Sequence, residues 1–167
     1  VIFLVIMVVM GLNQGMQPIV GYNYGAGQIS RSISAYKNAV IAATSVMVLC
    51  WLLCMFIPEY IVGFFTTDSF LIDISCRAIR IMVCVFPFVG FQITSTGLFM
   101  SMGMAHKSIF LSTTRQLLFL MPFLIILPKF YGTDGVWMSM PISDAVSCIV
   151  VAVMVYFQMK KFKKIDV

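Results

Sequence analysis

Charged residues are scarce in this chain, and acidic residues are the scarcest. Charged residues make up 10% of the 167 residues, against roughly 25% in an average soluble domain, and six Asp and Glu stand against eleven Lys and Arg. Hydrophobic residues make up 61%, and the mean hydropathy is +1.03. A water-soluble fold of this size cannot bury so much apolar surface, so the composition excludes an ordinary soluble domain.

Catalytic and metal-binding patterns are also missing. The chain has one histidine, no GxSxG or HExxH motif, and no paired CxxC spacing among its five cysteines. We therefore expect no enzyme activity, no metal site and no cofactor. A basic cluster ends the sequence, and we expect it to contact lipid headgroups and set orientation rather than bind nucleic acid. It consists of Lys160, Lys161, Lys163 and Lys164.

Long apolar stretches lie between the few charged residues. A helix needs about 20 apolar residues to cross the hydrocarbon core of a bilayer, so the pattern predicts an all-α polytopic transmembrane bundle of about five spans. The expected spans cover residues 1–25, 38–57, 81–102, 108–128 and 136–158. Val1 opens within an apolar run with no initiator Met, so we expect a fragment of a longer integral membrane protein.

Basic residues recur at alternate ends of these spans. Arg31 and Lys37 follow the first span, Lys107 follows the third, and the terminal lysines follow the fifth. Basic loops stay in the cytoplasm, so we expect these ends and the carboxy-terminus to be cytoplasmic. On the opposite side, Asp73 and Arg77 stand four residues apart, a spacing that allows an ion pair on one helix face.

Prolines and glycines indicate bends and close helix contacts. We expect Pro18 and Pro87 to kink their helices, because proline lacks an N–H and its ring clashes with the preceding turn. Gly11 and Gly15 form a GxxxG spacing that lets helix backbones approach closely.

Two ionisable residues are expected inside the membrane, where such groups are costly and are often functional. Asp144 lies near the middle of the last span, either as a protonatable or cation-binding carboxylate or as a structural ion-pair partner. Arg115 lies in the fourth span, and its long side chain either extends to the interface or reaches toward Asp144. The sequence leaves both alternatives open for each residue.

One face of the third span combines aromatic and polar side chains. Phe88, Gln92, Ser95 and Phe99 recur at i, i+4, i+7 and i+11. This mixture is typical of a cavity that binds an amphipathic organic molecule, so we predict that these four residues line a substrate cavity. Hydrogen bonding between helices is the alternative.

Several stretches together resemble the carboxy-terminal lobe of the multidrug and toxic compound extrusion (MATE) transporters, in the branch named after DinF. They are GLNQGMQPIVGYNYGAGQISRS, FFTTD, VFPFVGFQITSTGLFMSMGMAHKSI, STTRQLLFLMP and YGTDGVWMSMPISDAVS. The resemblance implies a fold of twelve helices in two lobes, of which this chain would supply helices eight to twelve. Helix seven and the amino-terminal lobe would be its partners within the same protein.

The resemblance also implies an activity. It suggests a secondary active antiporter in a bacterial inner (plasma) membrane, which exports organic and often cationic drugs or toxins in exchange for Na⁺ or H⁺ by alternating access. Some members use an acidic residue on helix ten for cation coupling, but residues 87–92 of this chain contain none. The alternatives are a lipid-linked oligosaccharide flippase of the related superfamily and a membrane scaffold without transport activity. A flippase cavity should be strongly cationic, and only Arg115 and Arg80 offer such charge here.

Overall fold

The computed structural model describes residues 2–163, with side chains to residue 162, and within them the chain is helical with no strand. The prediction of an all-α fold is confirmed. The elements in chain order are α1 (Ile2–Gly25), α2 (Ile29–Phe56), α3 (Pro58–Gly63), α4 (Ser69–Val83), α5 (Phe86–Ser101), α6 (Ala105–Thr113), a π-helical segment η1 (Thr114–Leu120) and α7 (Met121–Lys163).

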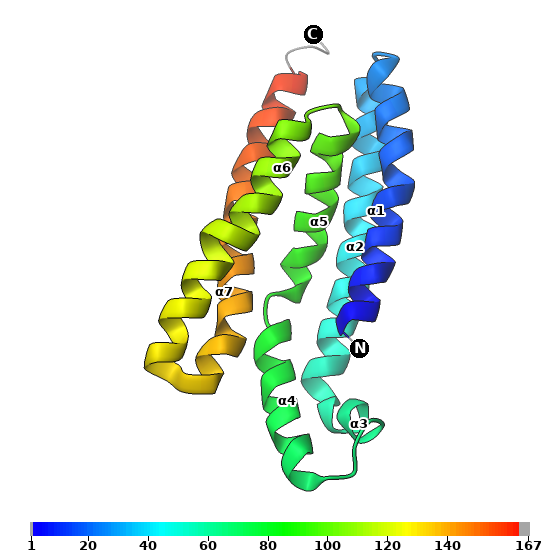
Figure 1. The fold of residues 1–167 in the computed structure, drawn as a ribbon. Coiled ribbons are helices and arrows are strands. Elements are labelled where there is room, and N and C mark those ends of the chain that lie inside the picture. The colour runs from blue at the N-terminus through cyan, green and yellow to red at the C-terminus, as the bar shows by residue number, and fades with distance from the viewer. Residues whose placement is uncertain (1, 164–167) are drawn as a thin grey trace.

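The long helices run up and down along a common direction (Figure 1). α1 and α2 form an antiparallel pair, and α5 packs against both and against α7. The α1–α2 turn, the α5–α6 turn and the end of α7 lie together at one end of the bundle (Figure 1). Arg31, Lys107 and Lys160 therefore share that end, as the alternation of basic loops predicts.

The last two expected spans form a helical hairpin. Ala105–Phe162 is one continuous helical stretch by its hydrogen bonding, but Gly132 has a φ of 58° and interrupts it. Glycine has no Cβ and adopts this left-handed backbone without steric cost, so the chain reverses there (Figure 1). Residues 105–131 and 133–162 thus run antiparallel.

Helices long and apolar enough to cross a membrane number three among the described residues, or four when the bent pair α4 and α5 counts as one. The 58-residue stretch Ala105–Phe162 is one of the three, although it folds back at Gly132. The count of five crossings stays a prediction that treats the two limbs of this hairpin as separate spans.

The expected third span differs most from the structure. Residues 81–102 begin inside α4 and cross a break at Cys84 and Val85, where the two helices bend by 50°. Pro87 stands in the first turn of α5, where its missing N–H is tolerated, and it provides no donor for a helix continuing from α4. It marks the start of a helix rather than a kink within one. Pro18, by contrast, lies inside the uninterrupted α1.

The second expected span is a longer helix than residues 38–57 suggest. α2 begins at Ile29, within the polar segment that follows α1, and ends at Phe56. The Ser32 hydroxyl donates to the carbonyl oxygen of Val20 at 3.3 Å, which ties this polar first turn to α1. The expected span began at residue 38 because the residues before it are polar. The helix begins nine residues earlier, because polar residues are compatible with a helix outside the hydrocarbon.

Close backbone contact holds α5 against α2. A Cβ built on Gly90 would lie 2.9 Å from the carbonyl carbon of Ala43, so only glycine allows this approach. Gly11 and Gly15 have no such neighbour within 4 Å among the described residues, so the predicted close approach at this GxxxG is absent there. Small residues matter in this setting because lipid gives no hydrophobic drive for helix association.

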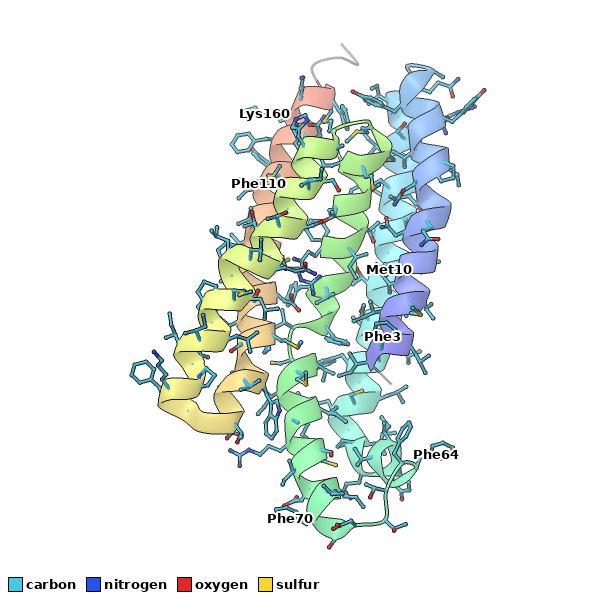
Figure 2. The ribbon with its side chains drawn as sticks, viewed as in Figure 1. Phe3, Met10, Phe64, Phe70, Phe110 and Lys160 are labelled. Carbon is cyan, nitrogen blue, oxygen red and sulfur yellow. The ribbon has the colours of Figure 1, made fainter. Side chains whose placement is uncertain are left out.

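Large apolar side chains cover the outside of the bundle. Phe3, Met10, Phe64, Phe70 and Phe110, labelled in Figure 2, are each at least half exposed. Only 11%, 22% and 28% of the residues in the apolar windows of the three long helices are buried. An outer surface of this kind is stable only against lipid or other apolar protein.

Candidate functional site

Arg115 and Asp144 form an ion pair between the two limbs of the hairpin. Nε of Arg115 donates to Oδ1 of Asp144 at 2.7 Å, and the two side chains are 33% and 14% exposed. This contact is one of the two arrangements that the sequence left open for Arg115. A partly buried carboxylate gains most from such a charged hydrogen bond, because removal of either partner leaves an unpaired charge.

Arg115 lies in an irregular part of its helix. η1 has π-helical hydrogen bonding over seven residues, a rare conformation that is often found at functional sites. The Ser143 hydroxyl donates to the Arg115 carbonyl oxygen at 3.1 Å. Adjacent residues of α7 therefore hold both the backbone and the side chain of Arg115.

A cavity of about 360 Å³ opens beside this ion pair. Its polar lining comes from Arg115, Gln116, Ser143 and Asp144. Its apolar lining comes from five elements and consists of Ile2, Phe3 and Ile6 of α1, Met82 of α4, Phe86 and Val89 of α5, Leu120 of η1 and Met140 of α7. The mixture of an apolar wall with a few convergent polar groups is typical of small-molecule sites.

Irregular segments converge on this cavity. Met82 and Phe86 flank the break between α4 and α5, and Arg115 and Leu120 belong to η1. Met140 and Ser143 flank Pro141 inside α7. Interrupted helices in membrane transporters usually surround the binding site, because their free backbone groups and bends shape the cavity.

Comparison with known proteins gives the family. The MatE family model matches residues 1–126 of the chain. The chain belongs to the MatE family. This match confirms the resemblance to MATE transporters, and it confirms the prediction that the chain belongs to an integral membrane protein.

The curated relatives of this MatE chain are multidrug export proteins. It is 22% identical over 150 residues to multidrug export protein MepA of Staphylococcus aureus (strain N315). The aligned residues cover 90% of this chain and 33% of that relative. This chain is 19% identical over 160 residues to MepA of Staphylococcus haemolyticus (strain JCSC1435), with 96% and 35% covered. The chain thus spans about a third of the length of these relatives.

Solved MATE structures share its fold. A structure of the MATE multidrug transporter DinF-BH, solved in complex with a ligand, is 40% identical, with a TM-score of 0.85 over 91% of this chain and 34% of that one. Inward-facing and outward-facing conformations of a "multidrug resistance MATE family transporter" match at 21% and 20% identity, each with a TM-score of 0.87. Each match covers 97% of this chain, and it covers 38% of the inward-facing and 37% of the outward-facing chain.

The predicted cavity face on α5 lies elsewhere in this MatE chain. Gln92 is 3% exposed, and Ser95 and Phe99 are fully buried, whereas Phe88 is 59% exposed. The structure therefore does not bring the four residues to one surface, and none of them lines the cavity beside Arg115. Their role in substrate binding stays a prediction.

Two contacts of the α5 face were not anticipated from the sequence. The Tyr36 hydroxyl of α2 lies 2.7 Å from the Ser95 hydroxyl, and either oxygen can donate. Nζ of Lys107 lies 5.6 Å from the centroid of the Phe99 ring and donates to Oε1 of Gln158 at 3.1 Å. Tyr36 lies in a polar stretch outside the expected second span, so the sequence carried no signal that it would reach α5.

The predicted pairing of Arg77 is different in the structure. Arg77 of α4 does not pair with Asp73 of its own helix but with Asp134 at the tip of the hairpin. The i, i+4 spacing made Asp73 a local partner, but the fold brings an acidic residue of α7 within reach of the same side chain. This second ion pair lies at the end of the bundle opposite to Lys107 (Figure 1).

Few other groups are placed for binding. Among the described residues, no group of three or more His, Cys, Asp or Glu side chains is placed to hold a metal ion. Four buried side-chain atoms have no hydrogen-bond partner within this same part of the chain, and they are Asn13 Oδ1, Trp51 Nε1, Gln92 Oε1 and Ser147 Oγ. Ser147 lies one helical turn beyond Ser143, close along α7 to the cavity.

Proposed function

We propose that the protein carrying this chain exports amphipathic organic compounds, often cationic, in exchange for Na⁺ or H⁺ by alternating access. In this proposal the chain forms the carboxy-terminal lobe, and an amino-terminal lobe and a further helix complete the transporter. Membership of the MatE family and likeness to proteins named for multidrug export support it. The 40% identity to a multidrug transporter solved in complex with a ligand also supports it.

The observation that carries the proposal is the cavity beside Arg115 and Asp144. Its apolar wall fits the body of an organic compound, and its paired charges fit a polar group. Structural ion pairs alone need no adjoining space, whereas this pair lines a cavity of about 360 Å³. Binding at a place where helices are interrupted allows the bound compound to favour one conformation over another.

Likeness to two conformations supports alternating access. The chain matches the inward-facing and outward-facing structures equally well, with a TM-score of 0.87 for each. The fold of the lobe is therefore common to both conformations. We infer that the lobe moves largely as a unit, and that ion and substrate drive the movement through their different affinities for the two states.

Asp144 is a poor candidate for the coupling site. Its carboxylate already accepts a hydrogen bond from Arg115, which supplies the positive charge that a bound Na⁺ or proton would otherwise supply. The start of α5 contains no carboxylate either. We therefore infer that the coupling ion binds outside this chain and that Asp144 mainly orients Arg115.

The proposal includes an orientation in the membrane. The end of the bundle that holds Arg31, Lys107 and Lys160 faces the cytoplasm, because basic ends remain on that side. The surroundings are a bacterial inner membrane, and lipid tails contact the exposed apolar side chains. The single arginine in the cavity is too little positive charge to hold a pyrophosphate group, so a lipid-linked oligosaccharide flippase is the weaker alternative.

Flux measurements test this proposal. The natural full-length protein, reconstituted in lipid vesicles, should transport a cationic dye against its gradient when a Na⁺ or H⁺ gradient is imposed. Transport should saturate with dye and stop when an ionophore collapses the gradient. Absence of ion-driven flux, with correctly inserted protein, would identify a scaffold, and flux of lipid-linked sugar alone would identify a flippase.

A further inference from the structure

The ion pair uses only part of the Arg115 side chain. A guanidinium carries five N–H donors, and Arg115 donates from Nε alone to Asp144. Among residues 2–163, its terminal nitrogens have no hydrogen-bond partner, and they are not among the buried unpartnered atoms. A third of the side chain is exposed, and it lines the cavity. The positive end of Arg115 is therefore accessible from the cavity.

Asp144 is the less accessible partner. Its side chain is 14% exposed, and one carboxylate oxygen is already bonded to Arg115 at 2.7 Å. A cationic group entering the cavity would meet the more exposed positive charge of Arg115, and only the second carboxylate oxygen of Asp144, Oδ2, is free to receive it. Displacing Arg115 from Oδ1 would leave a partly buried guanidinium without its counter-charge, which is unfavourable.

An acceptor group meets no such obstacle. A carboxylate can accept hydrogen bonds from the terminal nitrogens of Arg115 while Nε stays on Asp144, so both charged bonds are made together. Gln116 offers a further polar group in the lining of the cavity. Phe3, Phe86 and Met140 supply the apolar wall for the rest of the compound.

We propose that this cavity binds amphipathic organic acids and zwitterions, with their carboxylate on Arg115, in preference to the corresponding cations. The proposal rests on the proposed efflux function and narrows its substrate class for this lobe. Asp144 then holds the guanidinium through Nε, and its negative charge partly offsets the attraction of Arg115 for a carboxylate. A cation preferred by the protein as a whole would bind elsewhere.

A matched pair of dyes tests this proposal. A rhodamine ethyl ester and its free carboxylic acid share one scaffold and differ in the carboxylate. Their dissociation constants are measured by fluorescence anisotropy on the natural full-length protein in lipid nanodiscs, with empty nanodiscs subtracted. The wild type should bind the acid more tightly than the ester, and the measured quantity is the ratio of the two constants.

Three variants make the ratio diagnostic. The double variant Arg115→Gln/Asp144→Asn removes both charges, so it leaves no unpaired charge, and it should reduce the preference for the acid about tenfold. Asp144→Asn alone frees Arg115 from its counter-charge, so it should strengthen acid binding and weaken ester binding. Arg77→Gln/Asp134→Asn removes the other ion pair, outside the cavity, and should leave the ratio at the wild-type value.

Each outcome decides the proposal. The proposal is overturned if the Arg115→Gln/Asp144→Asn variant leaves the ratio unchanged. It is also overturned if Asp144→Asn weakens the binding of both dyes equally, or if the wild type binds neither dye. If the double variant does not fold, the Asp144→Asn variant still gives the opposite shifts or contradicts them. If the acid binds more tightly than the ester but the vesicles show no flux, this site is supported and efflux is refuted. If the ester is transported in response to an ion gradient but the Arg115→Gln/Asp144→Asn variant leaves the ratio of dissociation constants unchanged, this site alone is refuted.

Discussion

The hydroxyl groups of Tyr36 and Ser95 lie 2.7 Å apart in the buried contact between α2 and α5, although 59 residues separate them in the sequence. Tyr36 is 5% exposed and Ser95 is fully buried, so each hydroxyl depends on the other for a partner. This hydrogen bond belongs to the same α2–α5 contact as the close approach of Gly90 to Ala43.

We predict that Tyr36→Phe and Ser95→Ala each lower stability and do so non-additively. Hydrogen bonds between membrane helices contribute about 0.6 kcal/mol on average and at most about 1.7 kcal/mol, so the coupling energy should fall in that range. The measurement is a double-mutant cycle on thermal unfolding of the full-length protein in detergent. Strictly additive effects would show that the two hydroxyls do not interact.

Gly90 gives a second stability test. Gly90→Ala places a Cβ 2.9 Å from the backbone of Ala43, which no side-chain rotation relieves, so we expect a loss of about 1–3 kcal/mol from overpacking. Gly25→Ala is the matched control, because a Cβ there meets nothing within 4 Å. Thermal unfolding of both variants checks the prediction. Equal effects of the two substitutions would mean that α5 and α2 are not in backbone contact.

The sequence predicts the helical class because its apolar stretches are long and its charges lie between them. Pro87 indicates a break in the third span, and the helix interruption falls two to three residues before it, at Cys84 and Val85, because proline disrupts the turn that precedes it. No feature of the sequence indicates the π-helical segment η1, because no residue type specifies that conformation.

The candidate site was only partly predictable. Arg115 and Asp144 were identified because each is an isolated charge in an apolar span. A charged side chain is costly in a bilayer, so it normally faces the interior of the bundle or a water-filled cavity. The face with Gln92, Ser95 and Phe99 could not be assigned to a cavity or to a helix contact, since polar side chains in lipid serve both roles. Apolar cavity residues such as Phe86 and Met140 carry no signal in a chain that is apolar throughout.

The α5 face allows a direct comparison of the two interpretations. Phe99 is fully buried, so Phe99→Ala should lower stability by about 3–5 kcal/mol through loss of packing. Phe88→Ala, at a side chain that is 59% exposed, should cost far less. The measurement combines unfolding with transport of several dyes per folded molecule. A normal unfolding temperature with an altered dye profile for Phe99→Ala would favour the cavity interpretation.

Orientation in the membrane can be tested with single cysteines in a cysteine-free background. Arg31→Cys lies at the end of the bundle with the basic residues, and Thr133→Cys lies at the hairpin tip. A membrane-impermeant maleimide should label Thr133→Cys in intact cells and Arg31→Cys only after permeabilisation. Labelling of both from the same side would contradict the span count and the cytoplasmic basic end.

Protection of a cysteine by bound dye tests most directly whether a ligand occupies the cavity beside Arg115 and Asp144. Gln116→Cys lines this cavity, and Leu117→Cys, the next exposed position of η1, is absent from its lining and serves as the control. Saturating rhodamine acid should slow maleimide labelling of Gln116→Cys about tenfold or more and leave Leu117→Cys unaffected. Equal labelling rates of Gln116→Cys with and without dye would contradict the account.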